Sequence, residues 1–436
     1  SIHVTGVLDN TGQTLDIGAT GPFGAGGLTS LTGTIANGTI VSGDGTLLNT
    51  PSGTLDGVTI GSNLGFTGGY AYIYNHLLLA NGITVNKASA EWYLRSGGTQ
   101  NLAMVSGTAT INNAGGGTYA GYGVAGQTLQ IGAGVTFQGY GTLSDSTPAT
   151  IVNNGTLIGN TAGQTLTVSP TNFTNNGTLR VTAGTLTVTP TNWTNSATGS
   201  IQAQGGTLTL NGTSLGNSGA LSLSTGTVFN LGGTVTVASL GSFTRAAGST
   251  VNLPGTLNLG GGTLDIGSAG AFGTGGLSSL TGTLVNGTIV SNDGTLLNSS
   301  NGSLDGITIG SNLGFGGSST NFYNHLLLAN GITVDKNSNA WYFRTTGTQN
   351  LTTVSGTATI NNAGGGTYAG WGVAGQTLQV GSGVTFQGYG TFGDSSVATI
   401  VNNGTLIANT VGQTFTLNPT NLTNNGTLRV TAGTLT

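Results

Sequence analysis

Charge is scarce in this chain of 436 residues, which holds only 7 Lys and Arg and 11 Asp and Glu. An ordinary soluble domain is about 25% charged, so roughly a sixth of the usual ionic surface is present. Seven basic residues spread over this length cannot form the phosphate-neutralising patch of a nucleic-acid binder. A disordered chain combines low hydrophobicity with high net charge, whereas this chain is 36% hydrophobic with a net charge of −4. Nucleic-acid binding and general disorder are therefore both disfavoured.

Cysteine, proline and long apolar runs are also missing or rare. The absence of cysteine excludes a disulfide framework, a thiol nucleophile and a thiolate metal site. With 7 prolines and no Gly-X-Y period the chain is not collagen. No apolar run approaches the roughly 18 residues of a membrane-spanning helix. What remains, with 83 glycines, is a large, ordered and nearly uncharged β protein.

A long internal repeat organises the sequence. Residues 14–187 match residues 263–436 without a gap at a constant offset of 249, and roughly three quarters of the paired positions are identical. Residues 1–13 align loosely with the segment before the second copy. We therefore predict the end of a preceding copy at 1–13, a first 249-residue repeat at 14–262, and a second, truncated repeat at 263–436.

A shorter period lies inside the long one. The phrase Asn-Asn-Gly-Thr-Leu and its decayed forms recur at spacings of 22, 20 and 22 residues, between four-residue alternations of Thr with Leu, Ile or Val. Such alternation predicts strands with one buried face. A fixed recurrence at this length favours a right-handed parallel β-helix with about 20–22 residues per regular coil and almost no helix. The same register predicts a structural ladder formed by Asn153, Asn175, Asn195 and Asn217.

Stacking also accounts for the composition. Coils of a β-helix lie about 4.8 Å apart, so each side chain faces its counterpart on the next coil. Two like charges at that separation repel by roughly 1 kcal/mol in water. Thr, Asn and Ser stack without this cost, and Gly and Asn tolerate the left-handed backbone of tight corners.

The best catalytic constellation consists of His76, Lys87, Glu91 and Arg95, which could supply an acid–base pair and a cation for an acidic sugar. In the second copy Glu91 is replaced by Ala340. A carboxylate essential to chemistry should not drop out of one copy. We therefore predict no catalytic residues, no cofactor and no metal site, and a protein that is not an enzyme.

Two surface features remain as binding candidates. Aromatic side chains could stack on sugar rings, and the candidates are Trp92, Tyr93, Tyr122, Trp341, Tyr342 and Trp371. Outward Thr-x-Thr tracts could form an ice-binding face, although Thr is also an ordinary solvent-facing β-former.

Several phrases resemble those of a known protein class. They are Asn-Asn-Gly-Thr-Leu, Ala-Gly-Thr-Leu-Thr-Val and the phrase Gly-Gln-Thr-Leu-Gln-Ile-Gly-Ala-Gly-Val-Thr-Phe, which begins at Gly126. They are similar to the repeat tracts of giant bacterial surface proteins of the filamentous-haemagglutinin-like or autotransporter β-strand-repeat type. The resemblance covers essentially the whole chain. It implies a right-handed parallel β-helix outside the cell that serves as a shaft, fibre or adhesive surface.

Repeat, composition and resemblance together predict a structural extracellular fibre or stalk of bacterial origin, with an adhesive role. Its expected partners are copies of itself, joined head to tail or in tandem, and surface glycans. No nucleic acid and no membrane span are expected. The first alternative is a carbohydrate-binding or carbohydrate-active β-helix that uses the aromatic region. The second alternative is an ice-binding Thr face.

Overall fold

The computed structural model describes residues 1–436 and is a parallel β-solenoid of about 19 turns. Strands contain 61% of the residues and helix 1%, which confirms the predicted all-β fold. The chain forms two compact units, Ser1–Phe229 and Asn230–Thr436. No helix has the length and apolar character needed to cross a bilayer.

Alternating sequence explains the strands. In Thr165-Leu166-Thr167-Val168, the Leu and Val side chains are buried and the Thr side chains point outward. Because strand side chains alternate between faces, each such tract contributes two apolar residues to a narrow core and two hydroxyls to the surface.

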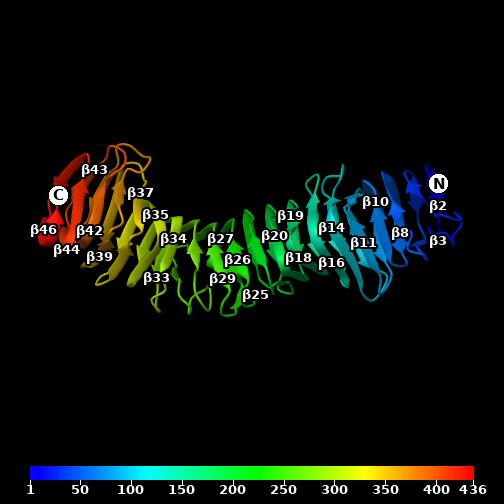
Figure 1. Ribbon diagram of the computed structural model, residues 1–436, viewed down its shortest axis with the longest axis horizontal. Helices are drawn as coiled ribbons and strands as arrows, with labels where there is room; N and C mark the ends of the chain where they lie inside the picture. The colour runs from blue at the N-terminus through cyan, green and yellow to red at the C-terminus, as the bar shows by residue number, and fades with distance from the viewer. The chain divides into compact units, whose positions relative to one another are not determined.

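Unit 1 has three faces, named A, B and C, and each is a parallel sheet whose neighbouring strands come from successive turns. Figure 1 shows strands of successive turns side by side. Face A contains β3 (Thr14–Asp16), β6 (Thr39–Val41), the second halves of β8 (Gly53–Ile60) and β10 (Tyr70–Leu79), β13 (Thr99–Met104), β15 (Thr128–Ile131), β17 (Thr150–Asn153), β19 (Asn172–Asn175), β21 (Asn192–Asn195) and β24 (Ser214–Asn217). Face B contains β1 (His3–Val4), β4 (Ser30–Leu31), β7 (Leu48–Asn49), β9 (Leu64–Thr67), β11 (Thr84–Ala88), the first halves of β14 (Ala109–Ala120), β16 (Val135–Asp145), β18 (Thr156–Val168) and β20 (Thr178–Val188), β22 (Ser200–Ala203) and β25 (Ala220–Leu223). Face C contains β2 (Val7–Asp9), β5 (Thr34–Ala36), the first halves of β8 and β10, β12 (Glu91–Leu94), the second halves of β14, β16, β18 and β20, and β23 (Thr207–Leu210).

Unit 2 repeats this arrangement, and its faces are named after the equivalent strands of the first copy. Face A contains β31 (Thr263–Asp265), the last parts of β33 (Thr283–Val290), β34 (Leu297–Ile309) and β35 (Leu313–Leu328), β38 (Thr348–Thr353), β41 (Thr377–Val380), β43 (Thr399–Asn402) and β45 (Asn421–Asn424). Face B contains β29 (Thr250–Leu253), β32 (Ser279–Leu280), the first parts of β34 and β35, β36 (Thr333–Asn337), β39 (Ala358–Ala363) and the first parts of β42 (Val384–Asp394), β44 (Thr405–Asn418) and β46 (Thr427–Leu435). Face C contains β27 (Thr234–Thr236), β30 (Thr256–Asn258), the first part of β33, the middle parts of β34 and β35, β37 (Ala340–Phe343), β40 (Thr367–Ala369) and the later parts of β42, β44 and β46. The remaining elements are β26 (Val228–Leu231), the 3-10 helix η1 (Val237–Leu240) and β28 (Ser242–Arg245).

Turn length is regular only in part of the solenoid. Thr150 pairs with Asn172, Asn172 with Asn192 and Asn192 with Ser214, so successive turns are 22, 20 and 22 residues long, as predicted. Earlier in the chain Thr99 pairs with Thr128, a turn of 29 residues. In that turn the segment between faces A and B (105–108) and the segment between faces C and A (121–127) are both longer than their counterparts 154–155 and 169–171.

The two copies of the repeat are not separated by a linker. Within unit 2, Asn252 pairs with Ser279 and Thr256 with Thr283, so strands of the first copy pair directly with strands of the second. The compact units divide at 229/230, whereas the sequence repeats divide at 262/263. The repeat boundary therefore lies inside continuous parallel sheets.

Candidate functional site

A ladder of buried amides runs along face A of unit 1. Asn153 Nδ2 donates to Asn175 Oδ1 at 2.7 Å, Asn175 Nδ2 to Asn195 Oδ1 at 2.7 Å, and Asn195 Nδ2 to Asn217 Oδ1 at 2.8 Å. The register that stacks equivalent positions places these side chains one above another, as the sequence spacing predicts. Each link pairs a buried donor with a buried acceptor, which gives the ladder a structural role, and Asn153 Oδ1 at its end has no partner.

A second amide ladder was not predicted. Gln127 Nε2 donates to Gln100 Oε1 at 2.9 Å, and Gln376 Nε2 donates to Gln349 Oε1 at 2.9 Å in the second copy. All four side chains are buried. The sequence signal is the phrase Gly-Thr-Gln followed by Gly-Gln-Thr, but its longer spacing falls outside the regular period.

No hydrogen bond joins the four residues of the predicted constellation to one another. Glu91 accepts a hydrogen bond from the Tyr93 hydroxyl, and the Arg95 guanidinium lies 4.6 Å from the ring of Tyr72. Lys87 points into the core instead. No ion pair joins any of these groups, and catalysis by them stays untested.

The buried lysine is itself unusual. Lys87 is fully buried, and its Nζ donates to the Ala90 carbonyl and, at 3.1 Å, to Asn113 Oδ1. Lys336 of the second copy is equally buried and donates to the equivalent Asn339 carbonyl and, at 3.1 Å, to Asn362 Oδ1. Burial lowers the pKa of each lysine to about 7, while the charge of Glu91 acts on Lys87 in the opposite direction.

Two of the six aromatic candidates are core residues, which corrects that part of the prediction. Trp92 and Trp341 are fully buried, and each packs edge-on against a phenylalanine with ring centroids 5.2 Å apart. The alternation of β12 and β37 turns these rings inward. Neither Trp can present a ring face to a sugar.

The other four aromatic candidates lie on the outer side of face C and its corner. Tyr93 stacks on Tyr119 at 5.3 Å, so the neighbouring turn covers one of its faces. Tyr122 lies 4.2 Å from Tyr93, and Trp371 lies 4.1 Å from Tyr342 in the second copy. Trp371 is 38% exposed. Sugar binding by Tyr93, Tyr122, Tyr342 and Trp371 stays a prediction.

Outward threonines form two short ranks on face C. Thr165, Thr185 and Thr207 lie in register, and Thr167 pairs with Thr187 in the adjacent rank. The ranks span three regular turns. Ice binding by this surface stays a prediction, and a measurement of thermal hysteresis would test it.

Aspartate side chains accept hydrogen bonds from backbone N–H groups at corners of the solenoid. Asp16 accepts hydrogen bonds from the backbone of Gly18 and Gly43, and Asp44 accepts them from Ala19 and Thr46. Hydrogen bonds from the Ala19 backbone and from Thr46 lower the pKa of Asp44 to about 2. No group of three or more His, Cys, Asp or Glu side chains is arranged to hold a metal ion.

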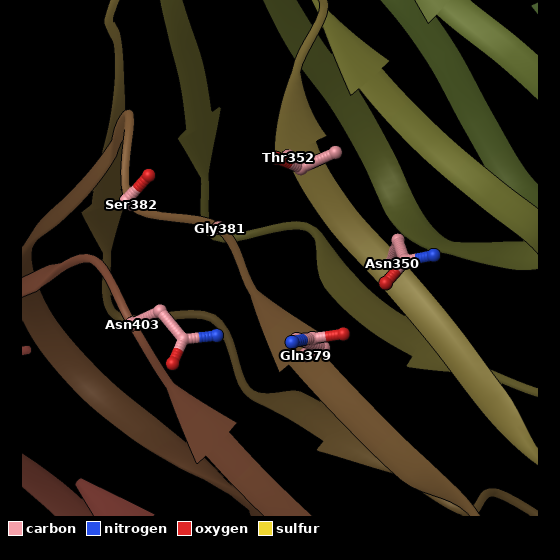
Figure 2. Close-up of a pocket in the computed structure, with 6 residues that line it drawn as sticks. All are labelled: Asn350, Thr352, Gln379, Gly381, Ser382 and Asn403. Carbon is pink, nitrogen blue, oxygen red and sulfur yellow. The ribbon is translucent and has the colours of Figure 1, made fainter. Parts of the chain in front are cut away.

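A shallow polar depression of about 490 Å³ opens on the second copy (Figure 2). It crosses the turns that carry β38, β41 and β43. Its lining is uncharged and consists of Asn350, Thr352, Gln379, Gly381, Ser382 and Asn403. Figure 2 shows Asn403 directed toward Gln379 across the floor of the depression.

Comparisons of this chain with models of protein families, with curated proteins and with solved structures give no match. The structure supports a β-solenoid built from tandem repeats. The finer resemblance to giant bacterial surface proteins rests on the sequence phrases alone.

Proposed function

We propose that this chain is a segment of a structural shaft or fibre at the bacterial cell surface, built from tandem 249-residue repeats. Its partners in this role are further copies of the same repeat, stacked in tandem or end to end. The protein acts as a stalk or adhesive fibre and not as an enzyme.

The observation that carries this proposal is the continuous pairing across the repeat boundary. Because Asn252 pairs with Ser279 and Thr256 with Thr283, one copy extends the sheets of the previous copy without a linker. Repeat proteins of this kind gain stability from each neighbour-to-neighbour interface. The fold can therefore be lengthened by adding copies, which is what a shaft requires.

Arg245 adds a side-chain clamp at the same joint. This residue belongs to the first copy, and its guanidinium donates to the Phe272 carbonyl at 3.2 Å and to Ser278 Oγ at 3.3 Å in the second copy. It also donates to the Gly276 carbonyl. These three hydrogen bonds come from one half-buried guanidinium. They hold the first loop of the second copy against the end of the first copy.

The scarcity of charge supports the same role. Stacked turns repeat each side chain at about 4.8 Å, and rows of like charge would repel along a long shaft. Amide ladders such as Asn153 to Asn217 replace repulsion with hydrogen bonds. A surface of this kind suits a long, chemically inert stalk.

Antibodies raised against residues 14–187 test the proposal on the cells that make the protein. We expect labelling of intact cells, loss of the label after external protease treatment, and labelled filaments or stalks in electron micrographs. Labelling that requires cell lysis, or labelled compact particles without any elongated form, would overturn the proposal.

A further inference from the structure

We propose that the polar depression in the second copy binds a neutral oligosaccharide. This activity goes beyond a structural role, because it would give the shaft a defined ligand site at Asn350, Gln379 and their neighbours. The site is separate from the aromatic residues of face C.

The first argument is that these amides leave their hydrogen-bonding groups free. Outward amides on neighbouring turns pair with each other elsewhere, as in Asn112 to Asn86 at 2.8 Å and Asn192 to Asn172 at 3.1 Å. Asn350 and Gln379 are register neighbours, yet their side chains make no hydrogen bond to the protein. The pairing seen in those rows is missing here, as it is between Asn101 and Gln130 of the first copy.

The hydroxyls of the depression are free as well. Thr352 and Ser382 make no side-chain hydrogen bond, and Asn403 uses its Oδ1 to accept from Asn425 at 3.0 Å while its Nδ2 has no protein partner. Gly381 keeps the floor open, because a Cβ atom there would lie 2.0 Å from Thr352 Oγ1. Hydrogen-bond donors and acceptors without protein partners therefore line the depression.

The class of ligand follows from the lining. There is no charge to recognise an acid, a base or a phosphate, and an apolar ligand would bury unpaired amides at a cost of about 1–3 kcal/mol each. Amides and hydroxyls both donate and accept hydrogen bonds, which matches the hydroxyls of an uncharged sugar. The volume of about 490 Å³ lies within the range of small-ligand sites, roughly 300–1,000 Å³.

The first copy provides a matched control inside the same molecule. It retains Asn101 and Gln130 at the positions of the two free amides, but it has Ala103 and Ala133 where the second copy has Thr352 and Ser382. The two hydroxyls therefore distinguish the second copy, and we expect one binding site per chain.

The experiment is calorimetric titration of the whole chain with cellohexaose, mannohexaose and chitohexaose, with hexagalacturonate as the acidic comparator. We expect at least one neutral sugar to bind with a stoichiometry of one and the acidic sugar to bind at least ten-fold more weakly. The pair Asn350→Ala and Gln379→Ala should weaken binding at least ten-fold, whereas Asn101→Ala with Gln130→Ala should leave it unchanged.

A gain-of-function variant separates this proposal from a general surface effect. Ala103→Thr with Ala133→Ser should raise the stoichiometry from one to two. Circular dichroism confirms that each variant keeps its fold. The proposal is overturned if none of the three neutral sugars binds, if both amide pairs weaken binding equally, or if the stoichiometry stays at one.

Discussion

The two copies of the repeat share their scaffold but differ on face C. In the first copy Tyr70 and Tyr72 lie 5.1 Å apart, and Arg95 stacks on the Tyr72 ring at 4.6 Å. The second copy has Ser319 and Asn321 at these positions, and Arg344 donates to Asn321 Oδ1 at 3.2 Å. At these outward positions the two copies make different side-chain contacts, while the register of the strands stays the same.

Most inward differences exchange one apolar residue for another, as in Ile131 and Val380, but one pair of inward positions becomes polar together. Ala71 and Ala90 are buried in the first copy, and their counterparts Thr320 and Asn339 are buried in the second. Thr320 Oγ1 donates to Asn339 Oδ1 at 3.0 Å. A buried polar group is tolerated when its partner changes with it, because an unpaired one costs about 1–3 kcal/mol. The comparison therefore shows one pair of core positions that is coupled by a hydrogen bond in the second copy.

The largest effect should come from the buried lysines, which the two copies share. The pKa of Lys87 and Lys336 in the folded protein is about 7, below the ordinary value of 10.5. The unfolded chain therefore binds more protons between these values, and stability should rise with pH across this window. We expect about 2 kcal/mol per lysine between pH 7 and pH 9. Urea unfolding followed across this range measures it.

Single variants assign this effect to each copy. Lys87→Met and Lys336→Met should each remove about half of the rise in stability with pH. Hydrogen exchange resolved for residues 84–120 and 333–369 reads the two copies separately. Stability that is flat or falls between pH 7 and pH 9 would contradict the prediction.

The second effect breaks the matched pair of the second copy. Asn339→Ala leaves the Thr320 hydroxyl unpaired and removes the donors to the Ser299 and Gly316 carbonyls, so the free energy of unfolding should fall by about 2–3 kcal/mol. Adding Thr320→Ala recreates the alanine pair of the first copy and should recover part of the loss. A double-mutant cycle in urea measures the coupling, and strictly additive losses would show that the pair is not coupled.

A backbone difference gives the third and smaller effect. Ala88 adopts a left-handed conformation with φ of 48°, and the second copy has Asn337 at this position with φ of 52°. Asn337 Nδ2 also donates to the Phe315 carbonyl at 2.8 Å. The left-handed conformation costs an alanine about 1 kcal/mol of folding free energy, whereas asparagine tolerates it.

Exchanging the two residues tests this difference. Ala88→Asn should stabilise the first copy by about 1 kcal/mol, and Asn337→Ala should destabilise the second by at least as much. Thermal unfolding of both variants gives the sign. A loss of stability in Ala88→Asn would contradict the backbone argument.

The period of the sequence predicts much of this fold, because stacked turns place equivalent residues of successive turns next to each other. The ladder from Asn153 to Asn217 is predicted by spacing alone. The burial of Trp92 was also readable, since Trp92 alternates with Leu94 and must share its face. Likewise Lys87 shares parity with Val85, which places it in the core.

Other features could not be read in the same way. The bond from Thr320 to Asn339 joins positions 19 residues apart, outside the regular spacing of equivalent residues. The free amides of Asn350 and Gln379 follow from side-chain orientation, which spacing does not determine. In the irregular turns the corners are longer, so the sequence period no longer predicts which residues of successive turns are neighbours.

The smallest effect concerns a single carboxylate that only the first copy has. Burial raises the pKa of Tyr93, and the hydrogen bond from its hydroxyl to Glu91 raises it further. Glu91→Ala recreates Ala340 of the second copy and should lower the pKa of Tyr93, because a neutral hydroxyl then loses its acceptor. Since Glu91 lies on the half-buried surface, the free energy of unfolding should change by less than about 0.5 kcal/mol. Ultraviolet titration of tyrosinate, with Tyr93→Phe as the subtraction control, measures the shift. An unchanged titration would mean that burial alone holds the proton on Tyr93 and that the two copies share this property despite the substitution.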